Sequence, residues 1–123
     1  MIEGIHHAQV TIPAGAEAEA LARAYYCDLL GLTEAPKPES LAGRGGMWLQ
    51  LAGSQVHLGV QEGVDRRASK AHVAYAVADL EAIREALSSQ GYTCEEGTPI
   101  PGYARFESRD PFGNRVEFIQ RLP

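Results

Sequence analysis

The sequence has few of the features that direct a protein to a membrane, out of the cell or onto nucleic acid. No apolar run approaches the length of a membrane span. Residues 1–4 lack the basic and apolar regions of a secretory signal. The formal net charge of −5 argues against a nucleic-acid partner and, less strongly, against an anionic membrane surface. We therefore expect a cytoplasmic protein with no nucleic-acid or membrane partner.

Cysteines and phosphate-binding motifs are also scarce. Cys27 and Cys94 are too few for a disulfide framework, and we interpret both as reduced thiols that pack as small apolar residues. The glycine cluster at residues 43–46 has no P-loop pattern, so a plain loop is expected there in preference to an anion cradle. The remaining composition, 45% hydrophobic and 22% charged in 123 residues, suits one domain with a modest core.

A turn near the C-terminus is the clearest local signal. In Asp110-Pro111-Phe112-Gly113, proline presets φ at the second turn position and glycine accepts the left-handed conformation that closes the turn. Alternating residues follow, so the turn is predicted to close a β-hairpin. In the strand after the turn, Val116 and Phe118 share one face and Glu117 points the other way.

The expected elements follow the order β-α-β-β-β twice, over residues 5–60 and 71–120, with a polar connector at 61–70. A helix is expected at 16–30 with Leu21, Tyr25 and Leu29 as its buried stripe, and another at 80–90, capped by Asp79. A short strand and a flexible loop are expected at 33–46, and a short strand at 92–95. We predict an α+β fold: one domain, residues 1–123, of two βαβββ modules that form a cup-shaped mixed sheet with helices on its outer face.

Four polar residues occupy matching positions in the two modules. His7 and His72 lie in the first strand of each module, and His57 and Glu117 lie in the last. Each points away from the apolar face of its strand, so all four can converge on one ion inside the cup. For each residue alone, a packed histidine or an exposed glutamate is the simpler interpretation. Four at matched positions favour a metal site, whereas His6, on the apolar face, is expected to be structural.

The composition of this set limits the metal. Three imidazoles and a carboxylate suit zinc, nickel, manganese or ferrous iron, whereas calcium or magnesium would need more oxygen ligands. Such an ion, with open coordination positions, could chelate two neighbouring oxygens of a small-molecule substrate and stabilise negative charge on them.

Other side chains are candidates for contact with the substrate. Arg105 could bind a carboxylate or phosphonate through its planar fork, and Glu107 could act as the base. An exposed ion pair of these two residues at the sheet rim is an equally open interpretation. Trp48 and Gln50 have the parity of the cup face and are predicted to line the pocket, with Tyr103 near its mouth.

With these motifs the chain resembles the vicinal oxygen chelate superfamily, which includes glyoxalase I, bleomycin-resistance proteins, fosfomycin-resistance enzymes and extradiol dioxygenases. The motifs are specific for the superfamily and not for any one member. They span nearly the whole chain: Ile5-His6-His7-Ala8-Gln9-Val10, Tyr25-Tyr26-Cys27-Asp28-Leu29-Leu30-Gly31-Leu32, Gln55-Val56-His57-Leu58, Ala71-His72-Val73 and Asp110-Pro111-Phe112-Gly113-Asn114-Arg115-Val116-Glu117.

The resemblance implies paired βαβββ modules, a dimer, and a divalent metal at His7, His57, His72 and Glu117. Glyoxalase I-like members use all four positions and more often have an acid where His57 stands. In fosfomycin-resistance-like members three positions suffice, matching His7, His72 and Glu117. The expected function is a metal-dependent isomerase, lyase or dioxygenase. The alternative is a non-catalytic protein that sequesters a drug, although bleomycin-binding members lack these ligands and would leave three histidines unexplained.

We also expect a homodimer. The connector at 61–70 is long and polar enough to let the two modules separate, and each half-sheet has an open edge that needs a neighbour. The cup would then be completed across the interface, with His7 and His57 of one chain facing His72 and Glu117 of the other.

Overall fold

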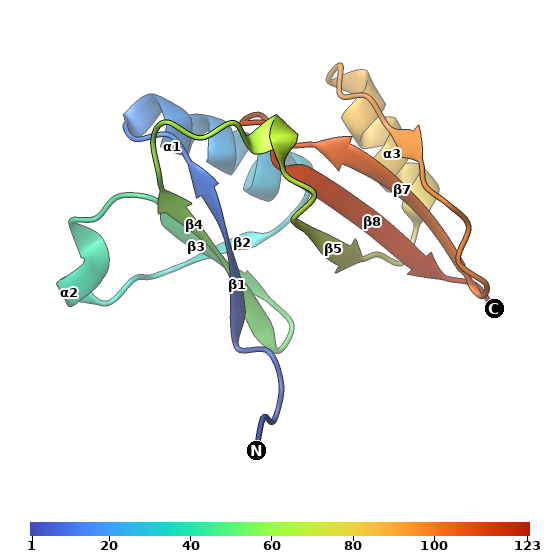
Figure 1. Ribbon diagram of the computed structural model, residues 1–123, viewed down its shortest axis with the longest axis horizontal. Coiled ribbons are helices and arrows are strands. Elements are labelled where there is room, and N and C mark those ends of the chain that lie inside the picture. The colour runs from blue at the N-terminus through green and yellow to red at the C-terminus, as the bar shows by residue number, and fades with distance from the viewer. The chain divides into compact units, whose positions relative to one another are not determined.

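Two four-stranded sheets, one in each half of the chain, form the framework of the protein (Figure 1). The computed structural model describes residues 1–123, and the chain divides into unit 1, Met1–Val64, and unit 2, Asp65–Pro123. Unit 1 contains β1 (His7–Ile12), α1 (Ala16–Ala22), η1 (Arg23–Leu29), β2 (Thr33–Ala35), α2 (Glu39–Ala42), β3 (Met47–Leu51) and β4 (Ser54–Val60). Unit 2 contains η2 (Arg66–Ala68), β5 (His72–Ala76), α3 (Leu80–Ser89), β6 (Glu95–Glu96), β7 (Tyr103–Arg109) and β8 (Arg115–Arg121).

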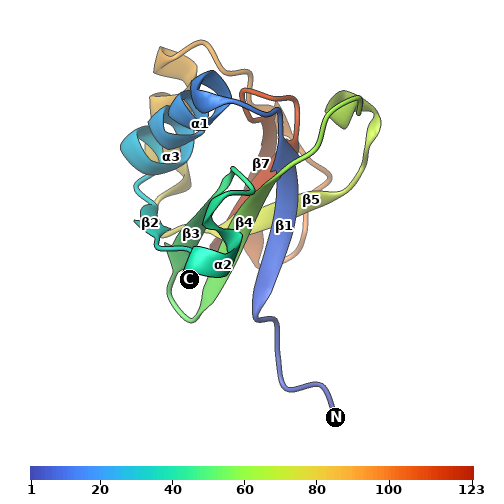
Figure 2. The same cartoon turned by 90° about the vertical axis from the view of Figure 1, so that its left-hand side faces the viewer.

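The two sheets have the same topology. Their strand orders are β1-β4-β3-β2 and β5-β8-β7-β6. In each sheet the first and last strands of the unit pair in parallel and the other neighbours pair antiparallel. The pairing of β1 with β4 can also be followed in Figure 2. The predicted α+β fold with two βαβββ modules is confirmed.

Strand alternation separates an apolar face from a polar one in both units. Met47, Leu49, Val56 and Leu58 are buried in unit 1, and Phe106, Val116 and Phe118 are buried in unit 2 with Leu87 of α3. The residues between them on β4 and β8, His57 and Glu117, point to the opposite face. The period-2 pattern therefore places the predicted ligand residues on the polar faces.

The first helix differs from its prediction. The chain forms α-helix only over α1 and continues as the π-helix η1, in which the amide N–H of Leu30 donates to the carbonyl oxygen of Tyr25 at 3.1 Å. A π-turn holds more residues than an α-turn, so the buried stripe rotates. Leu21, predicted to be buried, is 51% exposed. Tyr25 is buried as predicted, and Ala18, Ala22 and Tyr26 are buried with it.

The other differences are local. A one-turn helix, α2, lies where only a loop was expected, and β6 begins later than the predicted strand at 92–95. The helix predicted at 80–90 is confirmed as α3, and Asp79 caps it by accepting a hydrogen bond from the amide N–H of Ala82 at 3.1 Å. None of the helices has the length and apolar character needed to cross a bilayer.

Two glycines of unit 1 give a matched test of how the glycine-rich loop is fixed. Gly46 and Gly53 both have left-handed φ, +74° and +80°. A Cβ on Gly46 would collide with the carbonyl oxygen of Leu58, whereas a Cβ on Gly53 would meet nothing within 4 Å. We expect Gly53→Ala to cost only the left-handed penalty of about 1–2 kcal/mol. Gly46→Ala should cost at least about 2 kcal/mol more, because backbone must move to relieve the clash.

Urea unfolding of the two variants measures this difference. Equal losses of stability in the two variants would contradict the close approach of Gly46 to β4.

Candidate functional site

Three aromatic rings stack on the polar face of unit 1. The register of the sheet puts Trp48 of β3 opposite His57 of β4, and His7 of β1 lies diagonally across from His57. The ring centroids of His57 and Trp48 are 4.1 Å apart with planes within 3°, and those of His57 and His7 are 4.1 Å apart with planes within 14°. His57 is therefore held between His7 and Trp48.

A chain of hydrogen bonds sets the tautomer of His57. The side-chain amide of Gln50 donates to the carbonyl oxygens of Leu51 and Ser54, so its oxygen must accept from the amide of Gln55, at 2.9 Å. The Gln55 oxygen is then left facing His57 Nε2 at 2.8 Å, and His57 must donate. In the neutral ring this leaves the lone pair on Nδ1.

Burial and the neighbouring imidazole rings favour the neutral form of His57. Its exposed fraction is 6%. Burial has the largest effect on the pKa of His57 and lowers it below its ordinary value. The neighbouring His7 and His6 rings lower it further. His6, expected to be structural and either packed or at a strand edge, is not packed: it is exposed just before β1, with its Nδ1 at 2.9 Å from the Nδ1 of His7.

The polar face of unit 2 brings the other two predicted ligands together. His72 Nε2 lies 3.2 Å from Glu117 Oε1, because β5 and β8 are parallel neighbours. His72 Nδ1 lies 3.0 Å from the carbonyl oxygen of Lys70, which can only accept, so Nδ1 must carry the proton. In the neutral ring the Nε2 lone pair therefore faces a carboxylate oxygen, an arrangement that a cation between the two atoms would satisfy.

An ion-pair network continues from Glu117 across the sheet. Arg105 Nη1 lies 3.2 Å from Glu117 Oε1 and 3.3 Å from Glu107 Oε1, and Arg115 Nη2 also donates to Glu107 Oε1. The side chains of Arg105 and Glu117 are 13% and 8% exposed, so the pair is more buried than a rim contact. Arg105 Nε also donates to the carbonyl oxygen of Thr98 at 3.0 Å.

Gly97 provides the space for this contact. A Cβ on Gly97 would lie within 2.6–2.8 Å of the atoms of the Arg105 guanidinium. Arg105 is thus fixed by two carboxylates and by the backbone at 97–98, and in this arrangement its Nη1 pairs with Glu117. The expectation that it binds the substrate stays a prediction.

The network also bears on the proposed base. Hydrogen bonds from Arg115 and then from Arg105 lower the pKa of Glu107, against the opposing effect of burial. A general base works best with a pKa near the working pH, so this environment suits Glu107 to an orienting role.

Replacing Glu107 tests the network. At neutral pH Glu107→Gln should lower the free energy of unfolding by about 1–3 kcal/mol, because it leaves two guanidinium groups without their shared carboxylate. Since the folded-state pKa lies below the ordinary value of 4.5, this stabilisation is present above 4.5 and is lost as the pH falls through the folded-state pKa. Urea unfolding should therefore show the gap between variant and wild type closing in acid.

Glu95→Gln is the matched control. Glu95 is exposed, and it lies opposite Glu107 in the register of β6 and β7. This substitution should change stability by less than about 0.5 kcal/mol. A gap for Glu107→Gln that is the same at neutral and acid pH would contradict the assignment.

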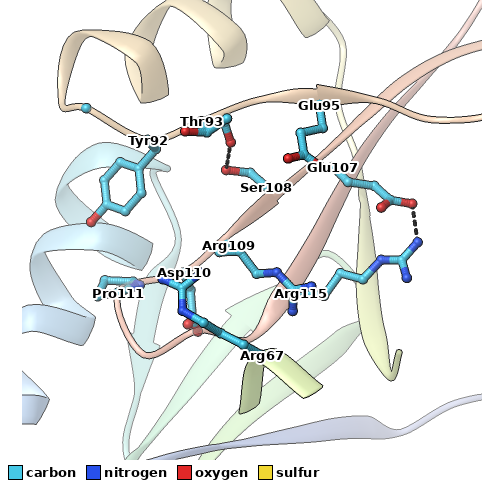
Figure 3. Close-up of a pocket in the computed structure, with 11 residues that line it drawn as sticks. Arg67, Tyr92, Thr93, Glu95, Glu107, Ser108, Arg109, Asp110, Pro111 and Arg115 are labelled. Atoms are coloured by element: carbon cyan, nitrogen blue, oxygen red, sulfur yellow. Dashed lines mark hydrogen bonds and ion pairs between the residues drawn. The ribbon is translucent and has the colours of Figure 1, made fainter. Parts of the chain in front are cut away.

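Each unit has its own cavity. The cavity of unit 2, about 700 Å³, is lined by three arginines, three acids and Tyr92 among others (Figure 3). The cavity of unit 1, about 540 Å³, is lined by His6, His7, Gln9, Lys37, Leu41, Arg44, Gly45, Trp48, His57, Leu58, Gly59 and Val60. Of the three predicted pocket residues, Trp48 lines the unit 1 cavity, Gln50 is exposed, and Tyr103 is 39% exposed at the start of β7.

The donor sets differ in how well they fit a metal ion. His72 and Glu117 fit, because an oriented imidazole nitrogen and a carboxylate oxygen face each other at 3.2 Å. His7 and His57 do not fit as two ligands of one ion, because an ion bonds in the plane of an imidazole and these planes are stacked. Neither unit by itself gathers three metal-binding side chains.

Sequence reasoning missed several residues of these sites. Gln55 and Arg115 share the faces of His57 and Glu117 by alternation, but alternation alone gave neither of them a role in the site. The Lys70 carbonyl and the space over Gly97 give no signal in the sequence, because each depends on the backbone path of a loop.

Comparison with known proteins identifies the family. The model of the Glyoxalase/Bleomycin resistance protein/Dioxygenase superfamily matches residues 4–118. The chain is 38% identical to a glyoxalase family protein from Bacillus anthracis, over 99% of this chain and 98% of that one, with a TM-score of 0.89. No curated protein matches it.

Two more distant structures show the fold alone. The fosfomycin resistance protein FosX from Listeria monocytogenes is 13% identical, over 99% of this chain and 96% of that one, with a TM-score of 0.76. The antibiotic binding protein TnmS3 from Streptomyces sp. CB03234 is 16% identical, over 98% of both chains, with a TM-score of 0.69.

Proposed function

Because the chain belongs to the Glyoxalase/Bleomycin resistance protein/Dioxygenase superfamily, we propose that it is a cytoplasmic metal-dependent enzyme whose substrate presents two adjacent oxygens to the ion. The reaction is an isomerisation, a lyase-type addition or an oxidative ring opening. The observation that carries the proposal is the His72–Glu117 pair, in which two ligand atoms face each other at 3.2 Å and both side chains are held by further contacts.

The proposed ligands are His7, His72 and Glu117, and the ion is zinc, nickel, manganese or ferrous iron. When bound, such an ion supplies Lewis-acid stabilisation of negative charge on substrate oxygens. The fourth expected ligand, His57, has a different part in this proposal. Its ring supports one face of His7, and its donated hydrogen bond to Gln55 fixes its own orientation.

Arg105 has a corresponding part in unit 2. It bonds the carboxylate of Glu117, and the Lys70 carbonyl fixes the ring of His72. Hydrogen bonds made to the side chains that bind an ion orient those side chains and tune their affinity for it. Glu107 in turn holds Arg105 in place, and Arg115 holds Glu107.

We further propose that the active species is a homodimer in which unit 1 of one chain and unit 2 of the other complete each site. The support is that each unit contributes only part of the three-residue set: His7 from unit 1, and His72 and Glu117 from unit 2. Two-fold pairing is the commonest closed symmetry among homo-oligomers.

Elemental analysis of protein purified without a metal-affinity tag tests the metal, and an activity screen that varies metal and substrate tests the reaction. A stoichiometric divalent metal supports an enzyme. A metal-free protein that binds an aromatic drug as tightly after His72→Ala would instead support sequestration.

A further inference from the structure

We propose that the unit 1 cavity beside His7 is an oxyanion subsite, and that the substrate carries a carboxylate, phosphonate or phosphate group attached to a planar or apolar body. This inference rests on the proposed function, since it names the class of substrate that the same site accepts. It is argued from the charge of the cavity wall, the fixing of the loop that supplies this charge, and the place of Trp48.

The wall of the cavity is positively charged in a negatively charged protein. Lys37 and Arg44 line it, and none of its lining residues is an aspartate or glutamate, although the chain has a net charge of −5. The carboxylate of Glu19 comes near Gly45 at the margin of the cavity, and it is only 3.8 Å from Arg23, which is bonded more closely to Glu34 at 2.8 Å. An oxyanion in the cavity therefore meets two cations and no carboxylate on the wall.

The loop that carries both cations is tied to the sheet. Lys37 Nζ donates to the carbonyl oxygen of Gly45 at 2.6 Å, which closes the loop on itself. Gly45 and Gly46 both have φ of +74°, and Gly46 lies so close to the Leu58 carbonyl that a side chain cannot fit. The bond to Gly45 is to a neutral acceptor. The hydrogen bond from Arg23 lowers the pKa of Glu34, and Lys37 also helps to lower it, but Glu34 lies outside the cavity wall, so Lys37 is a cation that faces a ligand.

Unit 2 provides the contrast. There Arg105 and Arg115 are paired with Glu107 and Glu117. The larger cavity of unit 2 has as many acids as arginines on its wall: Glu95, Glu107 and Asp110 against Arg67, Arg109 and Arg115 (Figure 3). Charge thus assigns the oxyanion to the smaller cavity, beside one proposed metal ligand, and away from Arg105.

The rest of the cavity suits a planar or apolar body. One face of the Trp48 ring is covered by His57, and the ring lines the cavity with Leu41 and Val60. A volume of about 540 Å³ is within the range of small-molecule sites, which combine apolar walls with a few placed polar groups. Aromatic rings prefer such stacked or edge contacts with indole.

The test uses Trp48, the one tryptophan of the chain, as the reporter. Benzoate should change its fluorescence in a saturable way, in both metal-loaded and chelator-treated full-length protein. Benzamide, the neutral analogue of the same shape, should bind at least about tenfold more weakly. Inorganic phosphate should displace benzoate, and added salt should weaken its binding.

Variants then locate the subsite. Arg44→Gln should weaken the binding of benzoate about tenfold, and Lys37→Met should weaken it by a similar factor. Arg109→Gln removes a cation from the other cavity and should leave benzoate binding within about twofold. Since Lys37→Met also breaks the bond to Gly45, Arg44→Gln is the decisive variant.

The outcomes separate this inference from the proposed function. Equal affinity for benzoate and benzamide, or unchanged benzoate binding in Arg44→Gln, would overturn the oxyanion subsite even if the protein holds a metal. Loss of metal binding with Arg44-dependent benzoate binding intact would overturn the metal enzyme and leave the subsite standing.

Discussion

Replacing Glu117 by Gln or His72 by Ala is expected to abolish stoichiometric binding of zinc, nickel, manganese or ferrous iron. Loss of a side chain that only orients a ligand costs about 10- to 100-fold in affinity, so loss of a direct ligand should exceed that range. The two atoms face each other at 3.2 Å, and each is held by a neighbour, Arg105 or Lys70. The nearest other carboxylate in unit 2 is that of Glu107, opposite Glu117, and it is held by Arg105 and Arg115.

His57→Phe provides the discriminating comparison. Phenylalanine preserves a flat ring between His7 and Trp48 but has no nitrogen donor. If His57 only supports His7, this variant should keep its metal, with affinity lowered by less than about tenfold, because the stack survives and only the bond to Gln55 is lost.

Calorimetric titration and elemental analysis measure these affinities, and urea unfolding shows that each variant is folded. A His57→Phe protein as depleted of metal as His72→Ala would restore the four-ligand set of the sequence prediction. Full metal content in Glu117→Gln would reject the site altogether.

Mixing two variants that have each lost the metal should restore binding, to one site per mixed dimer. His7→Ala damages unit 1 and Glu117→Ala damages unit 2. If sites form between chains, the intact unit 1 of one chain meets the intact unit 2 of the other, and the second site of the dimer carries both changes. If each site forms within one chain, every site in the mixture remains damaged.

Metal content after subunit exchange, measured against each variant alone, gives the answer. Exchange is verified with tagged copies, and a mixture of His7→Ala with His72→Ala should recover in the same way. A mixture of His72→Ala with Glu117→Ala is the control that should not recover, because both changes lie in unit 2. No recovery in the first two mixtures after proven exchange would rule out shared sites.

Alternation was sufficient to predict the sheets and the place of the four polar residues. Residues such as Val116 and Phe118 are buried while Glu117 faces the other way, and this period-2 signal is independent of the rest of the fold. It also put Arg105 and Glu107 beside Glu117, where they lie.

What alternation could not supply is the state of each side chain within its face. Alternation gives the face of His57 but not the stacking of its ring between His7 and Trp48. Stacking depends on the rotamers of three side chains that lie on three different strands. The π-helix η1 was missed for a similar reason. The α-helical period did find Tyr25, but the i+5 hydrogen bond changes that period, so the prediction was wrong at Leu21.

The parallel pairing of first and last strands also sets the order in which each unit can assemble. The hairpins β3–β4 and β7–β8 close over short turns, whereas β1 must find β4, and β5 must find β8, across nearly the length of a unit. Local hairpins form early, and distant parallel pairs must first overcome loop-closure entropy. In unit 2 this late pairing joins His72 to Glu117, and in unit 1 it joins His7 to His57. Under the proposed function, a growing chain would therefore offer a metal only single side chains, and binding of the ion would follow completed folding.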